Sequence, residues 1–220
     1  MAGIDVVSFD MEGTLIDNRF SDLIWETDIP ALYGCHHGLA LDEARERVIG
    51  EYREVGEDRP EWYDLGYWFR RLRLPGDWRE LPARRVDDCF VYPETAEVLE
   101  SLSRDYTLVV SSNTIREFLE VQLTKLPRVF TEVFSAPSDF NTVKKTDLFY
   151  GEICRTLDVE PSTVVHVGDS LKFDYHAPRA LGIGAYHLVR SREATGEHVV
   201  HDLKAFEEKV RRLTYVFKRV

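Results

Sequence analysis

Hydrophobic and polar positions first form a clear pattern at residues 6–16, where a short apolar run leads into polar residues. This run of strand-forming residues predicts a buried β-strand, which is followed by Asp10 and Glu12 and then by a glycine and a threonine. In an open α/β sheet, ligands bind beyond the carboxyl ends of the strands, so we expect both carboxylates to face a ligand crevice. An N-terminal hairpin with a solvated turn is the alternative that this stretch leaves open.

Residues 18–88 follow a different pattern, with apolar residues at helical spacing and no strand-like alternation. Helices are predicted within residues 21–34, 39–56, 60–74 and 77–90. The segment holds all four tryptophans, and its cationic side chains are all arginines, without a lysine. We expect a small helical bundle whose aromatic side chains form its core, with one or two of them facing the crevice.

From about residue 89 onward, short apolar runs alternate with helical patterns. Strands are predicted within residues 107–114, 129–135, 164–167 and 184–189, and helices within 93–104, 115–126, 148–159 and 176–183. A closing strand end followed by an amphipathic helix is predicted within 199–213, and a polar loop at 138–147. This alternation is typical of a parallel sheet covered by helices, so the predicted fold class is α/β with an inserted helical segment. The predicted core domain comprises residues 1–17 and 89–220, and the predicted helical cap comprises residues 18–88.

Composition narrows the possible functions. The 220 residues are 44% hydrophobic, which is enough for a sizeable core. The net charge of -11 argues against a nucleic-acid binder, because phosphate contacts need a basic surface. We expect no signal peptide and no membrane-spanning segment. Three cysteines lie far apart without metal-site spacing, which favours reduced thiols in packing roles and a cytoplasmic location.

Polar residues whose side chains can act in catalysis or binding follow the predicted strands or lie in loops on the same side of the sheet. They are Asp10, Glu12, Ser112, Asn113, Lys144, Lys145, Asp169 and Asp174. A parallel sheet would gather them in one crevice, where crowded carboxylates need a cation. Oxygen ligands without clustered Cys or His favour Mg²⁺.

These motifs resemble the haloacid dehalogenase (HAD) superfamily, in its phosphatase branch with a helical cap of the C1 type. The family's Asp-x-Asp-Gly-Thr signature is similar to residues 10–14, and its second-motif Ser or Thr is similar to Ser112. The lysine element, often Lys-Pro-Asp, resembles residues 145–147, with Lys144 as a neighbouring alternative. The Gly-Asp-x4-Asp element resembles residues 168–174. Four motifs in family order imply a Rossmann-like core from about residue 4 to about 190.

The resemblance implies an Mg²⁺-dependent phosphatase that hydrolyses a small phosphorylated metabolite. Asp10 would be the nucleophile that forms an aspartyl-phosphate, and Glu12 would be the general acid and base. Mg²⁺ would be bound by Asp10, the backbone carbonyl of Glu12 and Asp169.

The resemblance also implies which residues bind the phosphoryl group. Lys145, the Ser112 hydroxyl and backbone N–H groups near Asn113 would hold its oxygens. Asp174 would steady Lys145 or a metal-bound water, and Thr14 would fix the turn.

One residue departs from the family signature: Glu12 stands where the family usually has Asp. The longer acid can still transfer a proton, and its presence argues against a dehalogenase. It also leaves open a weakly active or regulatory HAD-fold protein. Phosphotransferase, phosphomutase and dehalogenase activities are further alternatives. The substrate and the oligomeric state are left open, although a cap arginine could contact a second anionic group. His166 is predicted to be a buried strand histidine without a catalytic role.

Overall fold

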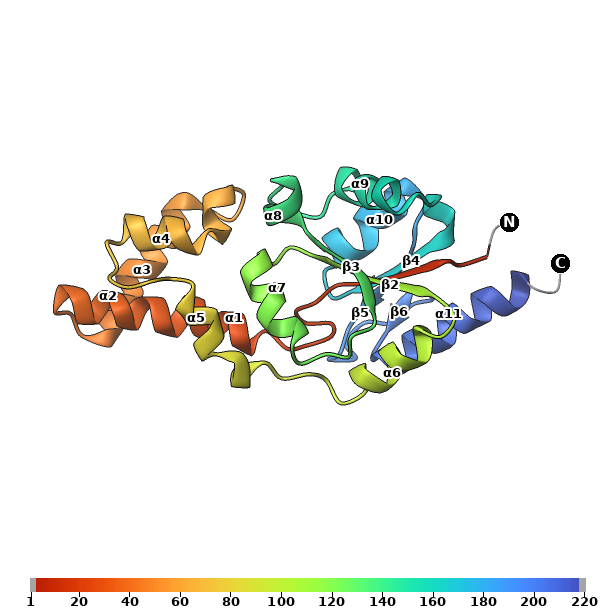
Figure 1. Cartoon of the computed structure of the whole chain (residues 1–220), viewed down its shortest axis with the longest axis horizontal. Helices are drawn as coiled ribbons and strands as arrows, with labels where there is room; N and C mark the ends of the chain where they lie inside the picture. The colour runs from red at the N-terminus through yellow and green to blue at the C-terminus, as the bar shows by residue number, and fades with distance from the viewer. Residues whose placement is uncertain (1–2, 218–220) are drawn as a thin grey trace.

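The computed structural model describes residues 3–217 and contains one six-stranded sheet in which the paired strands are parallel. The strands are β1 (Val6–Phe9), β2 (Thr107–Ser112), β3 (Phe130–Ser135), β4 (Val164–Gly168), β5 (Gly184–Leu188) and β6 (Val199–Val200). Their spatial order is β3-β2-β1-β4-β5-β6, so the first strand lies inside the sheet (Figure 1). The predicted α/β fold class is confirmed, and a terminal hairpin is excluded.

The register of β1 explains how the polar residues gather. Phe9, at the end of this strand, pairs with Val110 of β2 and with Val167 of β4. All four residues of β1 are buried, as expected for a parallel strand covered on both faces. Because the three neighbouring strands run in the same direction, the residues that follow them meet at one edge of the sheet.

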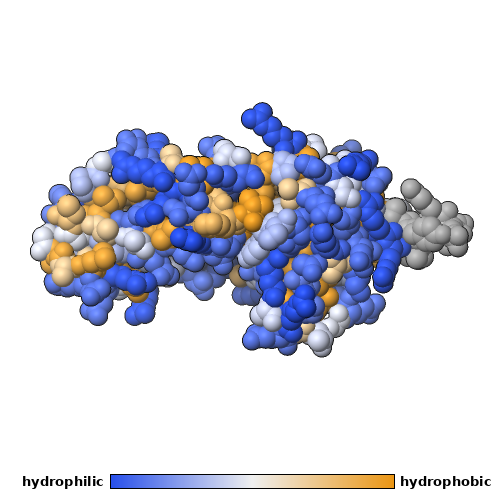
Figure 2. All heavy atoms as spheres, turned by 90° about the horizontal axis from the view of Figure 1, so that it is seen from below, coloured by the Kyte–Doolittle hydropathy of each residue, from blue (hydrophilic) through white to orange (hydrophobic). Residues whose placement is uncertain are grey.

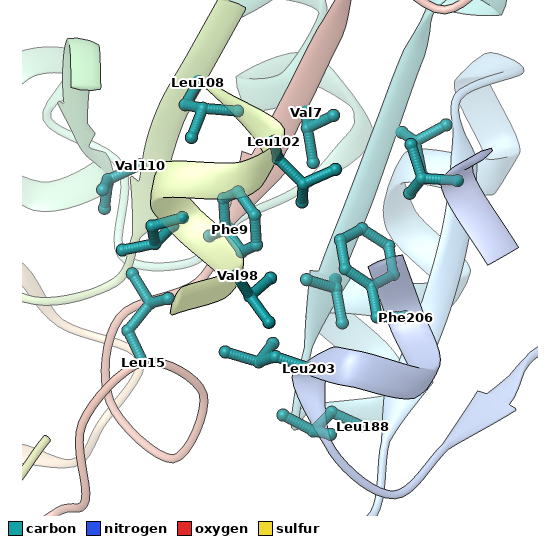
Figure 3. Packing of buried hydrophobic residues seen from close by; sticks show 14 of the residues in the cluster. Val7, Phe9, Leu15, Val98, Leu102, Leu108, Val110, Leu188, Leu203 and Phe206 are labelled. Atoms are coloured by element: carbon teal, nitrogen blue, oxygen red, sulfur yellow. The ribbon is translucent and has the colours of Figure 1, made fainter. Parts of the chain in front are cut away.

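Helices cover both faces of the sheet. They are α6 (Thr95–Leu102), α7 (Arg116–Leu123), α8 (Ala136–Phe140), α9 (Asp147–Leu157), α10 (Ala177–Leu181) and α11 (Leu203–Phe217). Figure 1 shows α6 and α11 on one side of the sheet and α9 and α10 on the other. Figure 3 shows the packing on the first side, where Val98 and Leu102 of α6 and Phe206 of α11 surround Phe9. The Phe9 and Phe206 rings meet edge to face at 5.7 Å.

The prediction of a loop at residues 138–147 was partly wrong, because α8 occupies its first residues. Ser135 caps this helix by accepting a hydrogen bond from the Ser138 N–H at 3.1 Å. Pro137 fits the first turn, and Asn141 ends the helix in a left-handed conformation with φ of 50°. These local signals outweigh the polar composition.

The structure describes every residue from 18 to 88, and the regular secondary structure of this segment is entirely helical. Its elements are α1 (Arg19–Leu23), a π-type turn (Ile24–Asp28), α2 (Ile29–His37), α3 (Leu41–Val55), a 3-10 turn (Pro60–Tyr63), α4 (Leu65–Arg71), α5 (Glu80–Arg84) and a second 3-10 turn (Val86–Asp88). The predicted single helix at 60–74 is divided, because the Asp64 side chain accepts a hydrogen bond from the Tyr67 N–H at 2.9 Å and begins a new helix there.

The helical segment 18–88, called the cap below, has its own hydrophobic cluster, which extends onto the sheet domain, called the core. Trp68 is fully buried, whereas Trp25, Trp62 and Trp78 are partly exposed. The same cluster includes Phe118 of α7, a helix of the sheet domain. Figure 2 shows hydrophobic residues on one face of the cap and near its junction with the core. The aromatic residues therefore form the bundle core, as predicted, and also join the bundle to the core.

Three further expectations have mixed outcomes. Cys89 and Cys154 are buried, as expected for packing residues, but Cys35 is exposed, so its predicted packing role was wrong. Within residues 3–217, no helix is long and apolar enough to cross a membrane. The division into a core of residues 1–17 and 89–220 and a cap of residues 18–88 stays a prediction.

Candidate active site

A buried lysine between two aspartates lies at the carboxyl edge of the sheet. Lys145 Nζ lies 2.5 Å from Asp10 Oδ1 and 2.5 Å from Asp174 Oδ1. It also donates a hydrogen bond to the Ser111 carbonyl oxygen at 3.2 Å. Although burial lowers the pKa of the Lys145 ammonium, Asp10 and Asp174 raise it above its usual value. The lysine is therefore held as a cation beside the predicted nucleophile.

The two neighbouring lysines have different surroundings. Lys144 Nζ pairs with Asp58 of the cap at 2.8 Å and with Glu57 at 3.3 Å. In contrast, the backbone N–H of Lys145 donates to Asn113 Oδ1 at 2.8 Å, which attaches the lysine loop to the end of β2. Of the two, only Lys145 contacts the aspartates of the site.

Three carboxylates lie close enough together to hold one cation. Ligand oxygens of Asp10, Asp169 and Asp174 lie within 4.8 Å of one another. Burial raises the pKa of Asp10 well above its usual value despite Lys145, and burial also raises the pKa of Asp169. A divalent cation would relieve this cost, and an all-oxygen donor set fits Mg²⁺. The donor chemistry therefore fits the metal that the sequence predicts.

Gly13 makes the close approach of Asp169 possible. Its φ is 74°, a left-handed conformation that favours glycine. A Cβ atom at this position would lie 2.2 Å from Asp169 Oδ2, which is a severe clash. The glycine of the first motif thus leaves the space that the Asp169 side chain of the last motif occupies.

A buried polar network lies behind Asp174. The His166 ring contacts Asp174 Oδ1 through Nε2 at 3.1 Å and the Ser8 hydroxyl through Nδ1 at 2.8 Å. The Tyr150 hydroxyl lies 3.0 Å from the same Nε2 and donates to the Phe173 carbonyl. Although burial raises the pKa of Asp174, Lys145 and His166 hold it below its usual range.

Sequence reasoning missed the polar residues of this network, apart from predicting that His166 is buried. Ser8 and Tyr150 lie inside an apolar strand and an amphipathic helix, respectively, and neither belongs to a motif. The signal that could have identified Ser8 is a polar side chain at a strand position that must be buried, whereas no comparable signal marks Tyr150.

Glu12 is directed toward a separate group of hydrogen-bond donors. Its carboxylate accepts from Thr114 Oγ1 at 3.0 Å, from Gln122 Nε2 at 2.6 Å and from the Ser21 hydroxyl of the cap. Burial raises the pKa of Glu12 above its usual value, although these donors lower it. The acid is consequently attached to both the core and the cap.

The remaining predicted residues lie near these groups. Ser112 is buried, and its hydroxyl accepts from the Thr114 N–H at 3.1 Å. The Thr14 hydroxyl donates to Asp10 Oδ2 at 3.4 Å, so its side chain is directed at the predicted nucleophile. The roles of all these residues stay predictions.

A cavity of about 240 Å³ lies between cap and core, beside the predicted acid. Its lining residues are Glu12, Ser21, Asp22, Trp25, Trp62, Tyr63, Asn113, Thr114, Ile115 and Phe118. Because the lining includes residues that follow β1 and β2, the cavity connects the candidate chemistry with the cap.

A parallel sheet with a helical cap and an Asp–Lys–Asp cluster at its carboxyl edge defines a class of capped α/β enzymes. The family model of the haloacid dehalogenase-like hydrolases matches residues 4–182, so the chain belongs to this family of hydrolases. The resemblance inferred from the motifs is confirmed.

Individual relatives agree with this assignment. The structure of a HAD phosphatase from Thermococcus onnurineus is 25% identical, with a TM-score of 0.81 over 94% of this chain and 98% of that chain. A 2-haloacid dehalogenase from Pseudomonas syringae pv. Tomato has a similar fold, with 21% identity and a TM-score of 0.69 over 95% of this chain and 99% of that chain. The GMP/IMP nucleotidase YrfG of Escherichia coli is 35% identical over 71 residues. That match covers 32% of this chain and 32% of the nucleotidase, about a third of its length.

Proposed function

We propose that this hydrolase is an Mg²⁺-dependent phosphatase acting on a small phosphomonoester. The observation that carries the proposal is the buried Lys145 between Asp10 and Asp174, close to Asp169. A cation fixed beside a candidate nucleophile suits an anionic substrate, because it offsets the repulsion between carboxylate and phosphate. The similarity to a HAD phosphatase and to part of a nucleotidase supports the same reaction class.

In the proposed first step, an Asp10 carboxylate oxygen attacks phosphorus. The new bond gives an aspartyl-phosphate, while the bond from phosphorus to the ester oxygen breaks and Glu12 donates a proton to that oxygen. In the second step, Glu12 removes a proton from water, and the water oxygen attacks phosphorus. The bond to Asp10 then breaks, which releases inorganic phosphate and restores both carboxyl groups.

The remaining residues would bind and orient the phosphoryl group. Lys145, the Ser112 hydroxyl and backbone N–H groups near Asn113 would hold its oxygens as charge develops. Asp10, the backbone carbonyl of Glu12 and Asp169 would hold Mg²⁺, which supplies charge neutralisation when bound. In this proposal, Asp174 orients Lys145 through the contact of 2.5 Å. Thr14 would orient Asp10 through its hydroxyl.

The first test measures phosphate release from p-nitrophenyl phosphate with Mg²⁺ and with excess chelator. We expect activity only with the metal, and a decrease in kcat of about 10³-fold or more in Asp10→Asn, because the amide cannot act as the nucleophile. Circular dichroism of the variant controls for folding. Equal rates in wild type and variant would exclude the proposal and favour a regulatory protein. Metal-independent fluoride release from fluoroacetate would instead indicate a dehalogenase.

A further inference from the structure

The cavity between cap and core is lined largely by aromatic and apolar side chains. Trp25, Trp62 and Tyr63 line it from the cap, and Ile115 and Phe118 line it from the core. Glu12 and Asn113 belong to the same lining, so a group in the cavity would contact two residues of the predicted site. The cavity therefore lies where a leaving group would extend away from the phosphate.

The tryptophan rings are held in place by their neighbours. The Trp25 ring lies 5.9 Å from Phe118 and 6.0 Å from Tyr52, centroid to centroid. Tyr52 lies 5.8 Å from the Trp62 ring and donates its hydroxyl to the Trp25 carbonyl oxygen at 3.1 Å. The Trp62 carbonyl oxygen accepts from Trp68 Nε1 at 3.0 Å. Rings fixed in this way form a preorganised surface for a flat ligand group.

The charged residues of the cavity wall are acidic. Asp22 and Glu12 line it, and none of the lining residues is a lysine or an arginine. Burial raises the pKa of Asp22, as do the neighbouring carboxylates of Glu26 and Asp17. A second anionic group on the substrate would meet these carboxylates without a compensating cation.

Most arginines of the cap form ion pairs, and none of them lines this cavity, so its lining offers no support for the expected cap arginine at a second anionic group. They form ion pairs with acids of the cap, namely Arg45–Glu26, Arg47–Glu43, Arg59–Glu61, Arg70–Asp64, Arg71–Glu51, Arg79–Asp77, Arg84–Glu80 and Arg85–Asp28. None of these paired arginines belongs to the lining of the cavity.

We propose that this cavity selects phosphomonoesters whose leaving group carries a planar ring without negative charge. Stacking on Trp25 and Trp62 would favour such a ring. Asp22 would disfavour substrates with a second anionic group. This inference rests on the proposed phosphatase function and adds the substrate class to it. A nucleobase and a simple aromatic alcohol share the required ring.

Matched substrates test the proposal in the presence of Mg²⁺. Benzyl phosphate carries a planar ring, cyclohexylmethyl phosphate a puckered ring, and 4-carboxybenzyl phosphate a planar ring with a second anion. We expect kcat/KM to be roughly tenfold higher for the benzyl ester than for either of the other two. Inosine 5′-monophosphate and ribose 5-phosphate form a second pair, of which only the first carries a base. The relative rates of inosine 5′-monophosphate and benzyl phosphate then show whether a nucleobase or a simple aromatic alcohol is preferred.

Two variants assign the selectivity to named residues. Trp62→Leu should reduce the preference for benzyl over cyclohexylmethyl phosphate to less than about threefold. Asp22→Lys should raise kcat/KM for 4-carboxybenzyl phosphate relative to benzyl phosphate by about tenfold. Glu46→Lys makes the same charge change at an exposed cap position outside the cavity lining, and it should leave this ratio unchanged.

The outcomes separate the two levels of the proposal. If none of the esters releases phosphate, the phosphatase function is wrong, and the substrate inference is wrong with it. If phosphate is released but the benzyl, cyclohexylmethyl and carboxybenzyl esters react equally well, only the substrate inference is overturned. The same conclusion holds if Glu46→Lys changes the ratio as much as Asp22→Lys does. Circular dichroism of each variant verifies that it is folded.

Discussion

Glu12 has an environment that suits a group changing its protonation state. Thr114 and Gln122 fix its carboxylate from the core, and Ser21 fixes it from the cap. Aspartate is one methylene shorter and would not reach all of these donors from the same backbone position. The departure from the family signature is thus accompanied by hydrogen-bond partners that match the longer side chain.

Replacing Glu12 tests its proposed role as general acid and base. Glu12→Gln preserves size but cannot transfer a proton, so we expect kcat to fall by about 10²- to 10⁴-fold. Glu12→Asp keeps an acid and should retain more activity than Glu12→Gln. The measurement is steady-state phosphate release at saturating substrate. Unchanged release by Glu12→Gln would contradict the acid–base role.

Lys145 and Lys144 provide a matched pair for stability. Lys145→Met leaves two buried carboxylates without their cation, so the free energy of unfolding should fall by about 3–5 kcal/mol. Lys144→Met removes ion pairs to the exposed Glu57 and Asp58, which should cost less than about 1 kcal/mol. Urea denaturation with a chelator present measures both. Similar losses would contradict the buried arrangement.

The candidate catalytic and metal-binding residues were easier to predict from the sequence than the buried polar network behind Asp174. Asp10 and Asp169 follow apolar runs, so the geometry of a parallel sheet is sufficient to predict their convergence. In contrast, the contact between His166 and Asp174 joins residues eight positions apart through a strand and a following turn. No spacing rule identifies such a contact, because it depends on side-chain directions in the folded chain.

At the scale of elements, strands were easier to predict than helix ends. Residues 6–9 and 164–168 are continuous buried runs, and their composition leaves little choice of structure. Helix ends depend on single hydrogen bonds, such as those that Ser135 and Asp64 accept at the starts of α8 and α4. One such hydrogen bond can determine where a loop ends and a helix begins, and the pattern of hydrophobic residues carries no information about it.

The segment that leads from the cap back to the core contains Cys89, which allows a test by pH. Burial raises the pKa of the Cys89 thiol from 9.0 to about 11. The folded chain therefore binds this proton more tightly than the unfolded chain does. This contribution to stability is present below pH 9 and is lost as the pH rises from 9 toward 11.

Urea midpoints measured from pH 8 to 10.5 should thus fall more steeply for wild type than for Cys89→Ala. Iodoacetamide labelling at pH 9 gives an independent readout, because a thiol of pKa 11 is only about 1% thiolate there. Cys35 is exposed and should react first. Labelling of Cys89 at the rate of Cys35 would show that the segment is open in solution.

At the scale of the whole molecule, cap and core share one hydrophobic cluster. Phe118 of α7 belongs to the cap cluster, with its ring 5.2 Å from Phe20 and 5.9 Å from Trp25. The next residue, Leu119, belongs to the cluster beneath the sheet instead. Helix α7 therefore contacts both hydrophobic clusters, through Phe118 on one side and Leu119 on the other. Substitutions at these two residues can distinguish the docking of the cap from the stability of the core.

Phe118→Ala should loosen the cap selectively. Removing a ring that is 2% exposed should cost about 3–5 kcal/mol, and amide hydrogen exchange should quicken mainly in residues 19–88, because the lost contacts belong to the cap. Leu119→Ala is the control, since its fully buried side chain contacts the sheet cluster, and its faster exchange should centre on the strands. Hydrogen exchange with mass spectrometry resolves the two patterns. Identical patterns in both variants would mean that cap and core open as one unit.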